Sequence, residues 1–317
     1  MHNVHFRQGD ASVTFRTDRA EVMQAAIDTL YGYRITPPGR ARWDITLHAA
    51  AVLDTATITT DCTGAQSAQY WAARLVRQAM TAQLLAAGAV YAPPAAFSHR
   101  GRGVLVTGHK GAGKTTTLVT SLRLLGGDYL TNDRLLLRRE RGELVGRPWP
   151  AHIRVGVGAL LAMPDLADLV PAALRDLPQC QRWHHQVKVA IEPPEFSRLL
   201  SGGAVISEIR PRLMLWPYLS PGNTGAAPAA APADEAHDVL LSTRLFMLDP
   251  ASGVSGHINH WLFGTGPVAQ AAENLRHVVE DLAATVPCYR MPVDGDPAAL
   301  AARISELLAP IPPPATT

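Results

Sequence analysis

The chain has 317 residues, enough for two domains or for one large domain with an appended piece. Its composition, 47% hydrophobic and 18% charged, is ordinary for a globular protein, and a net charge of +2 gives no basic footprint that would predict nucleic-acid binding. No apolar run approaches the roughly 20 residues of a membrane helix, and the first residues lack the apolar core of a secretory signal, so we expect a cytoplasmic protein with no membrane partner.

Residues 1–95 are predicted to form an N-terminal α+β module. Stretches rich in β-branched residues predict strands, and apolar residues at helical spacing predict helices. His48 is interpreted as a strand residue and not as a catalytic one. The expected strands lie near 13–15, 43–48 and 56–60, and the expected helices span 19–31 and 70–85.

A glycine-rich loop between an apolar run at 104–106 and a helical pattern at 116–125 is the strongest signal in the chain. It fits G-x-x-x-x-G-K-[ST], the phosphate-binding P-loop, whose backbone N–H groups and following helix N-terminus bind a polyphosphate. Lys114 is expected to reach the β- and γ-phosphates of ATP, and the Thr115 hydroxyl to ligate Mg²⁺. The residues predicted to hold the nucleotide are Gly108, His109, Lys110, Gly111, Ala112, Gly113, Lys114, Thr115 and Thr116.

A polar turn follows the P-loop helix. We predict a strand over 129–131 that ends at Asn132 and Asp133, and a second strand from Leu135. A carboxylate at a strand end beside a P-loop is well placed to bind Mg²⁺ or to act as a base, so Asp133 is the candidate for both roles. Asn132 and Arg134 are the candidate orienting groups. The alternative is an ordinary solvated turn, which Asn and Asp often form.

The loop predicted at 146–160 contains weaker candidates. Arg147, His152 and Arg154 are candidates for holding an anion, and Trp149 for stacking on a planar group, because function concentrates in loops. Ordinary loop packing and solvated charge are the simpler interpretation of these side chains.

The C-terminal part is predicted from its patterns alone. The segment 183–188 is interpreted as a surface strand, and 221–236 as a low-complexity flexible insertion. The run 244–249 resembles a Walker B strand, but Asp249-Pro250 is also a typical turn opener. An amphipathic helix over 267–284, a strand from Cys288 and a closing helix over 297–308 complete the chain.

The P-loop, the segment Leu130-Thr-Asn-Asp-Arg-Leu135, and Val286-Pro-Cys-Tyr-Arg290 before a terminal helix together resemble the HPr kinase-like family. Relatives in this family share a P-loop core with phosphoenolpyruvate carboxykinase. The resemblance covers about residues 86–317. It implies an α/β fold with a mixed-sheet P-loop core at 96–317, beside the smaller N-terminal α+β module, and ATP-dependent phosphotransfer with Mg²⁺.

Two features depart from the family pattern. In such families the strand after the P-loop helix ends in two adjacent acids, a general base followed by a residue that helps to position Mg²⁺. Here the first of these positions is Asn132, so Asp133 is left as the candidate for both tasks. The family also usually places a His shortly before the P-loop strand, where this chain has Tyr91-Ala-Pro-Pro.

The sequence therefore predicts an ATP-dependent kinase that transfers the γ-phosphate to a hydroxyl group of a small biosynthetic metabolite, such as a nucleoside or a sugar-like compound. A serine on a peptide or carrier protein is the alternative acceptor. A second alternative is an ATP-binding regulatory module without transferase activity, which the amide at 132 favours. The sequence is compatible with a homo-oligomer.

Overall fold

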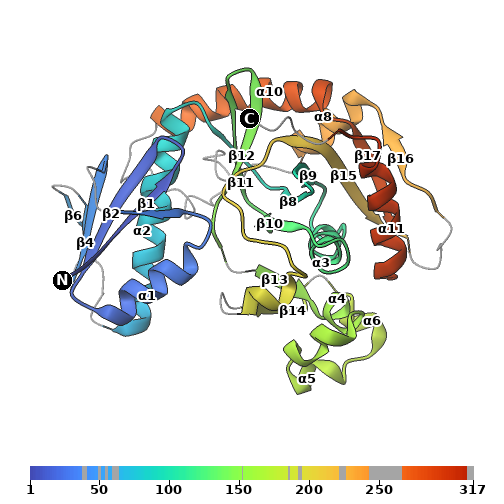
Figure 1. Ribbon diagram of the computed structural model, residues 1–317, viewed down its shortest axis with the longest axis horizontal. Helices are drawn as coiled ribbons and strands as arrows, with labels where there is room; N and C mark the ends of the chain where they lie inside the picture. Colours follow the sequence, from blue (N-terminus) through green and yellow to red (C-terminus); the bar gives the residue numbers. More distant parts are fainter. Residues whose placement is uncertain are drawn as a thin grey trace.

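The computed structural model describes residues 1–37, 41–48, 51–53, 56–58, 64–151, 153–184, 186–191, 195–220, 226–242 and 266–312. It shows a mixed α/β protein in which a β-sheet near the N-terminus and a second sheet around the P-loop lie side by side (Figure 1). The predicted α/β class with a mixed sheet is confirmed. A division of the chain at residue 95 stays a prediction.

The N-terminal sheet has six strands in the order β3-β1-β2-β4-β5-β6. Its pairs are antiparallel except β2 with β4, which run in parallel. Helices α1 (Ala20–Thr29) and α2 (Ala65–Ala86) pack against it, and small buried residues of α2, such as Ala72 and Ala79, allow close approach. The strands are β1 (His2–Gln8), β2 (Ala11–Thr17), β3 (Arg34–Thr36), β4 (Trp43–Leu47), β5 (Ala51–Leu53) and β6 (Ala56–Ile58).

The second six-stranded sheet has the order β10-β8-β9-β15-β17-β16. Strand β15 pairs in parallel with both β9 and β17, whereas β8 is antiparallel to both β9 and β10. Strands β9, β10, β15 and β17 therefore run in one direction and end at the same edge. The strands are β8 (Ala95–His99), β9 (Arg102–Val106), β10 (Asp128–Thr131), β15 (Pro211–Leu219), β16 (Ala229–Ala231) and β17 (Cys288–Val293).

Two smaller sheets and several helices surround this centre. One sheet has the order β12-β11-β7, and β13 forms an antiparallel pair with β14. The strands are β7 (Val90–Ala92), β11 (Leu135–Glu140), β12 (Glu143–Pro148), β13 (Ile153–Gly156) and β14 (Lys188–Ile191). The remaining helices are α3 (Lys114–Leu124), α4 (Val157–Leu161), the 3₁₀ helix η1 (Pro164–Leu169), α5 (Ala172–Arg175), α6 (Gln179–Arg182), α7 (Phe196–Leu199), α8 (Ala233–Ser242), α10 (Gly266–Thr285) and α11 (Pro297–Leu308).

Helix α10 links the two halves of the fold. It packs against α2 at one end of the molecule and against α8, β7 and β11 further along (Figure 1). One apolar core accordingly runs from the N-terminal sheet through α2 to α10, and a second fills the space among α3, α4 and α11. None of the helices in the described ranges is long and apolar enough to cross a membrane.

Most predicted elements are confirmed, including both N-terminal helices, the P-loop helix and the closing helix over 297–308. The segment 183–188 differs from its prediction, because Trp183 ends the turn after α6 and strand β14 begins only at Lys188. Part of the segment 221–236 forms regular structure, namely β16 and the start of α8, where no fold was expected. His152 and the Walker B-like run that ends at Asp249 lie outside the described residues.

A buried ion pair fixes α11 to the end of β17. The Asp294 side chain is fully buried, and its Oδ2 accepts a hydrogen bond of 2.8 Å from Arg303, which is 12% exposed. Burial alone would raise the pKa of Asp294, but the hydrogen bonds from Arg303 and from the Asp296 N–H outweigh it, so the pKa lies below 3.8. The pair is therefore ionised and stabilising at neutral pH.

Asp294→Ala should lower the free energy of unfolding by about 3 kcal/mol, because it leaves the Arg303 guanidinium buried without its carboxylate. Since the pKa of Asp294 is depressed, the contribution of the pair is fully present above pH 3.8 and is lost only as the pH falls through the lowered value. Urea unfolding at pH 7 and at stepwise lower pH measures both effects. Asp44→Ala, which removes the exposed pair with Arg16, should change the unfolding free energy by less than about 1 kcal/mol.

Candidate functional site

The candidate site lies at the sheet edge where four parallel strands end. The P-loop follows β9, the Asn132-Asp133 turn follows β10, and Asp294 follows β17. Only β8 separates β10 from β9, and neighbouring strands lie about 4.8 Å apart, so the two loops start about 10 Å from each other. A ligand bound at this edge is within reach of both, which is the usual place for ligands on sheets with parallel strands.

The loop between β9 and α3 depends on glycine for its shape. Gly108, Gly111 and Gly113 have φ values of 130°, 88° and 105°, which other residues rarely adopt. A Cβ on Gly108 would lie 3.2 Å from Trp216 Cδ1, and one on Gly113 would lie 3.3 Å from Val293 Cγ2. The loop therefore rests directly on the ends of β15 and β17. Gly113 is also the N-cap of α3 and offers no side chain to the first amides of the helix.

Lys114 folds back over this loop. Its Nζ donates hydrogen bonds to the carbonyl oxygens of Gly108, at 2.6 Å, and His109, at 2.9 Å. Burial lowers its pKa to about 8, against the opposing effect of the Asp133 carboxylate. The ammonium group is thus held against the backbone of the loop.

The chain contains only three lysines among its 317 residues, and all three gather at this site. Lys110 is exposed on the P-loop, and Lys188 is half-buried at the start of β14, in the two-stranded sheet with β13. Burial lowers the pKa of Lys188, the charges of Arg154 and Lys110 lower it further, and Asp133 opposes them. The two-stranded sheet β13–β14 thus adds two cations to the site, Lys188 and Arg154, that come from outside the P-loop.

The three polar residues of the turn after β10, Asn132, Asp133 and Arg134, differ in their exposure to solvent and in their partners. The Asp133 side chain is 55% exposed, and its charge acts on both Lys114 and Lys188. Asn132 is buried, and its Oδ1 has no hydrogen-bond partner among the described residues. Arg134 lies beside Asp133, with Nε 3.6 Å from Oδ1. The carboxylate therefore projects from the turn on the side where the lysines lie.

A chain of buried hydroxyls connects this turn to the N-terminal part of the molecule. The Asn132 backbone hydrogen-bonds the Tyr129 hydroxyl, which lies 3.0 Å from the Tyr31 hydroxyl. Tyr31, which follows α1, in turn donates to the Ala151 carbonyl at 3.0 Å. Burial raises the pKa of both tyrosines, so both remain neutral hydroxyls. The N-terminal part thus fixes the backbone that carries Asp133.

Trp149 supports the same turn from the other side. The guanidinium groups of Arg134 and Arg77 lie over its ring, at 4.6 and 4.8 Å from the centroid, and its Nε1 donates to Thr81. The residue is only 4% exposed, so its ring is not free to stack on a ligand. Arg147 is likewise occupied, since it forms ion pairs with Glu140 and Glu208. Of the two interpretations of these side chains, internal packing is the one that the structure supports.

The side chains at this edge fit a magnesium ion that is bound together with phosphates. Mg²⁺ usually takes one or two protein oxygen ligands and completes its shell with phosphates and water. Thr115, in the first turn of α3, and the exposed carboxylate of Asp133 are oxygen ligands of this kind. Within the described ranges no group of three or more His, Cys, Asp or Glu residues is placed to hold a metal without such a partner.

Sequence patterns brought out the P-loop and Asp133 but missed Lys188, Tyr31 and Tyr129. The scarcity of lysine was a usable signal for Lys188, because two of the three lysines already lie in the P-loop. No local pattern marks the two tyrosines, which meet across 98 positions of the chain. Their roles depend on tertiary packing alone.

No family model matches this chain, and no curated protein matches it. Among solved structures it is similar to the HPr(Ser) kinase/phosphatase from Coxiella burnetii, at 13% sequence identity. The match covers 68% of this chain and 95% of that one, with a TM-score of 0.34. A likeness at this level is distant, so membership of the HPr kinase-like family stays a prediction, and what the site does must follow from its own residues.

Tyr31→Phe should lower the free energy of unfolding by about 1–3 kcal/mol, because it leaves the Ala151 carbonyl and the Tyr129 hydroxyl with one partner fewer inside the protein. Tyr70→Phe is the matched control, since Tyr70 is exposed on α2, and it should change the stability by less than about 0.5 kcal/mol. Urea unfolding of the three proteins checks both values. Equal stability of the two variants would contradict the supporting role of Tyr31.

Proposed function

We propose that this protein is an ATP-dependent phosphotransferase that moves the γ-phosphate of ATP to a hydroxyl group. The observation that supports it most directly is the meeting, at one sheet edge, of a glycine-shaped loop, an uncapped helix N-terminus, all three lysines and the Asp133 carboxylate. Phosphoryl transfer needs little beyond positioning and charge stabilisation, and these groups provide both.

The P-loop residues 108–116 would hold the phosphates. The backbone N–H groups at the start of α3 would donate hydrogen bonds to the phosphate oxygens, and the helix dipole favours a negative charge at that end. The Lys114 ammonium, now bound to two loop carbonyls, would exchange one of them for phosphate oxygens. Lys188 approaches from β14 and would neutralise charge that builds up on the transferred group. Its place outside the P-loop suits a group that contacts the terminal phosphate.

Thr115 and Asp133 would hold Mg²⁺, which when bound supplies positive charge to the phosphate oxygens. Asp133 is also the candidate base for the acceptor hydroxyl, because it is the exposed carboxylate of the turn. Asn132 is buried and would act on the acceptor only through the position of the turn, and Arg134 would hold the Asp133 side chain in place.

The class of the acceptor hydroxyl is the open part of this proposal. The sequence favoured a small metabolite on two grounds, the loss of the paired acids at 132 and 133 and the Trp- and Arg-rich segment 147–154, but the Arg147 and Trp149 side chains are engaged inside the protein. The second ground therefore falls away, and a serine side chain on a peptide or carrier protein becomes a stronger alternative acceptor. Asn132 is an amide at a position where an acid was expected, so a regulatory ATP-binding module without transferase activity is the non-enzymatic alternative.

Lys114→Ala should weaken ATP binding at least tenfold, because it removes a charge-assisted contact with the phosphates, and should abolish transfer. Asp133→Asn should leave ATP binding within a few-fold and lower transfer by at least a hundredfold. Asp44→Asn, in the N-terminal sheet, is the control and should behave like the unchanged protein. Calorimetry measures binding, and γ-labelled ATP offered with serine peptides and with small polyols measures transfer.

Each outcome of this experiment has a clear meaning. Label on polyols alone or on peptides alone assigns the acceptor. Tight binding of ATP without transfer to either class, with Asp133→Asn indistinguishable from the unchanged protein, identifies the regulatory module instead. Normal transfer by Lys114→Ala would remove the basis of the proposal.

Bound ATP with Mg²⁺ should protect Lys114 and Lys188 from an amine-specific acylating reagent, because both ammonium groups would then face phosphate. The α-amino group of the exposed Met1, which precedes β1 of the N-terminal sheet, is the internal control and should react equally with and without nucleotide. Peptide mass spectrometry after brief acylation reports each amine separately. Protection of Lys114 but not of Lys188 would confine the phosphates to the P-loop and remove Lys188 from the proposed chemistry.

A further inference from the structure

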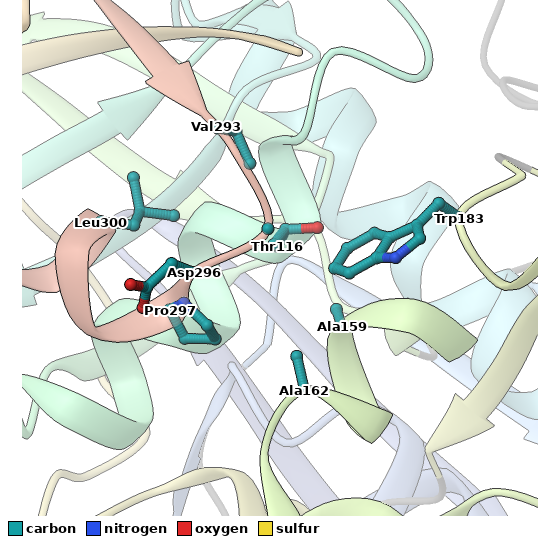
Figure 2. A pocket seen from close by; sticks show the side chains of 9 residues that line it. Thr116, Ala159, Ala162, Trp183, Val293, Asp296, Pro297 and Leu300 are labelled. Carbon is teal, nitrogen blue, oxygen red and sulfur yellow. The ribbon is translucent and has the colours of Figure 1, made fainter. Parts of the chain in front are cut away.

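The crevice beside the P-loop helix has no room for a ligand. Thr116, in the first turn of α3, lies among Trp183, Ala159 and Pro297 there (Figure 2). Gly158 lies against the Trp183 ring, where an added Cβ would come within 2.5 Å of Cδ2, so the packing is tight. The gap that remains admits no water molecule. The acceptor in the proposed reaction therefore approaches the P-loop from another side.

The two-stranded sheet β13–β14 has an open face next to the P-loop. Its register pairs Arg154 with Ala190 and Gly156 with Lys188, so these four residues share one face. Arg154 and Ala190 are exposed, and a Cβ on Gly156 would meet no other atom within 4 Å. The space above Gly156 is thus free and is bordered by two cations. The opposite face packs into the core that surrounds α3 and consists of Ile153, Val155, Val189 and Ile191.

The charge of Arg154 is not balanced by any carboxylate of the described residues. Arg154 and Lys188 are diagonal neighbours on the sheet, about 7–8 Å apart at the backbone. Their like charges disfavour each other, and Asp133 acts on Lys188 as an opposing charge. The guanidinium of an arginine matches a carboxylate or a phosphate with two parallel hydrogen bonds. An oxyanion bound above Gly156 would therefore contact Arg154 and relieve the repulsion.

We infer that this face binds the acceptor, and that the acceptor is a short alcohol with a carboxylate or phosphate group that Arg154 holds. The inference rests on the proposed phosphoryl transfer at the P-loop. The acceptor oxygen forms a bond to the γ-phosphorus, the bond from that phosphorus to the β-phosphate breaks and releases ADP, and the hydroxyl proton passes to Asp133. Arg154 makes no contact with the transferred group and is a specificity-determining residue.

The dimensions of this face limit the size of the acceptor. Lys188 is the proposed contact of the terminal phosphate, and Arg154 is its diagonal neighbour. A carbon–carbon bond spans about 1.5 Å, so about two to four carbon atoms separate the hydroxyl from the oxyanion. Each strand of the sheet has four residues and is about 13 Å long. A face of this length suits a small molecule better than an extended peptide.

The first test compares three acceptors of equal carbon number, namely glycerol, glycerate and glycerol 3-phosphate, with γ-labelled ATP as donor. The unchanged protein should use at least one of the two anionic acceptors with a kcat/KM at least tenfold above that of glycerol. Arg154→Ala should raise KM for that acceptor at least tenfold, because a charge-assisted contact is lost, with kcat within a few-fold and glycerol unaffected. Arg154→Lys should restore part of the loss. Arg276→Ala, which removes an exposed arginine of α10, is the control and should change nothing.

A second variant tests the free space without removing a charge. Gly156 has a φ of −63°, which other residues adopt readily, so Gly156→Leu should fold normally and fill the space above the sheet. It should lower transfer to all three acceptors at least tenfold and leave ATP binding unchanged in calorimetry. Gly64→Leu is the matched control, because Gly64 also precedes a helix, has a φ of −74° and has open space around it.

The outcomes separate this inference from the function on which it rests. Transfer to only one anionic acceptor identifies the oxyanion as a carboxylate or a phosphate. Glycerol used as well as its anionic analogues, equal losses on glycerol and the anionic acceptor in Arg154→Ala, or transfer to serine peptides alone overturns the oxyanion site while phosphotransfer stands. Binding of ATP without transfer to any acceptor overturns the proposed function and this inference with it.

Discussion

The parallel pairing of β15 with β9 and with β17 is the constraint on which the rest of this molecule depends. It turns the carboxyl ends of three adjacent strands to one edge, and β10 joins them across the antiparallel β8. The strand directions decide which loops meet at this edge, and the side chains of those loops then make up the site. Three segments are therefore neighbours: the P-loop, the turn with Asp133 and the β17–α11 connection. The first and the last of them lie more than 150 residues apart in the chain.

The N-terminal part of the chain contributes to this edge without reaching the bound ligand that we propose. Tyr31 hydrogen-bonds Tyr129, and Arg77 of α2 stacks on Trp149, which also contacts Arg134. Both contacts hold the segment that carries Asp133. A carboxylate that must meet a phosphate and a metal needs a backbone fixed to a fraction of an ångström, and buried hydrogen bonds supply that rigidity better than exposed ones. The N-terminal sheet and its helices thus serve as the support for a turn on another sheet.

The sequence predicted the parts of this structure that depend on local patterns. The P-loop, its strand and its helix were recognisable because glycine, lysine and threonine occupy fixed spacings, and α11 because its apolar residues recur at helical spacing. It favoured ordinary packing for Arg147 and Trp149 over a binding role, but it could not name the residues against which they pack. Their partners, Glu208 for Arg147 and Arg77 for Trp149, lie 61 and 72 positions away, and such contacts leave no local trace. The structure also contains β16 and the start of α8 within residues 221–236, whose low-complexity composition predicted no regular structure.

The amide at position 132 has a physical explanation in this fold. Asn132 is 7% exposed and its Oδ1 has no partner among the described residues. An aspartate in the same place would bury a negative charge without a cation, which is far more costly than burying an amide oxygen. Asp133, one residue further on, is exposed, and its carboxylate acts on Lys114 and Lys188. Of positions 132 and 133 only 133 therefore carries a carboxylate, and any metal binding or proton transfer by this turn has to use it.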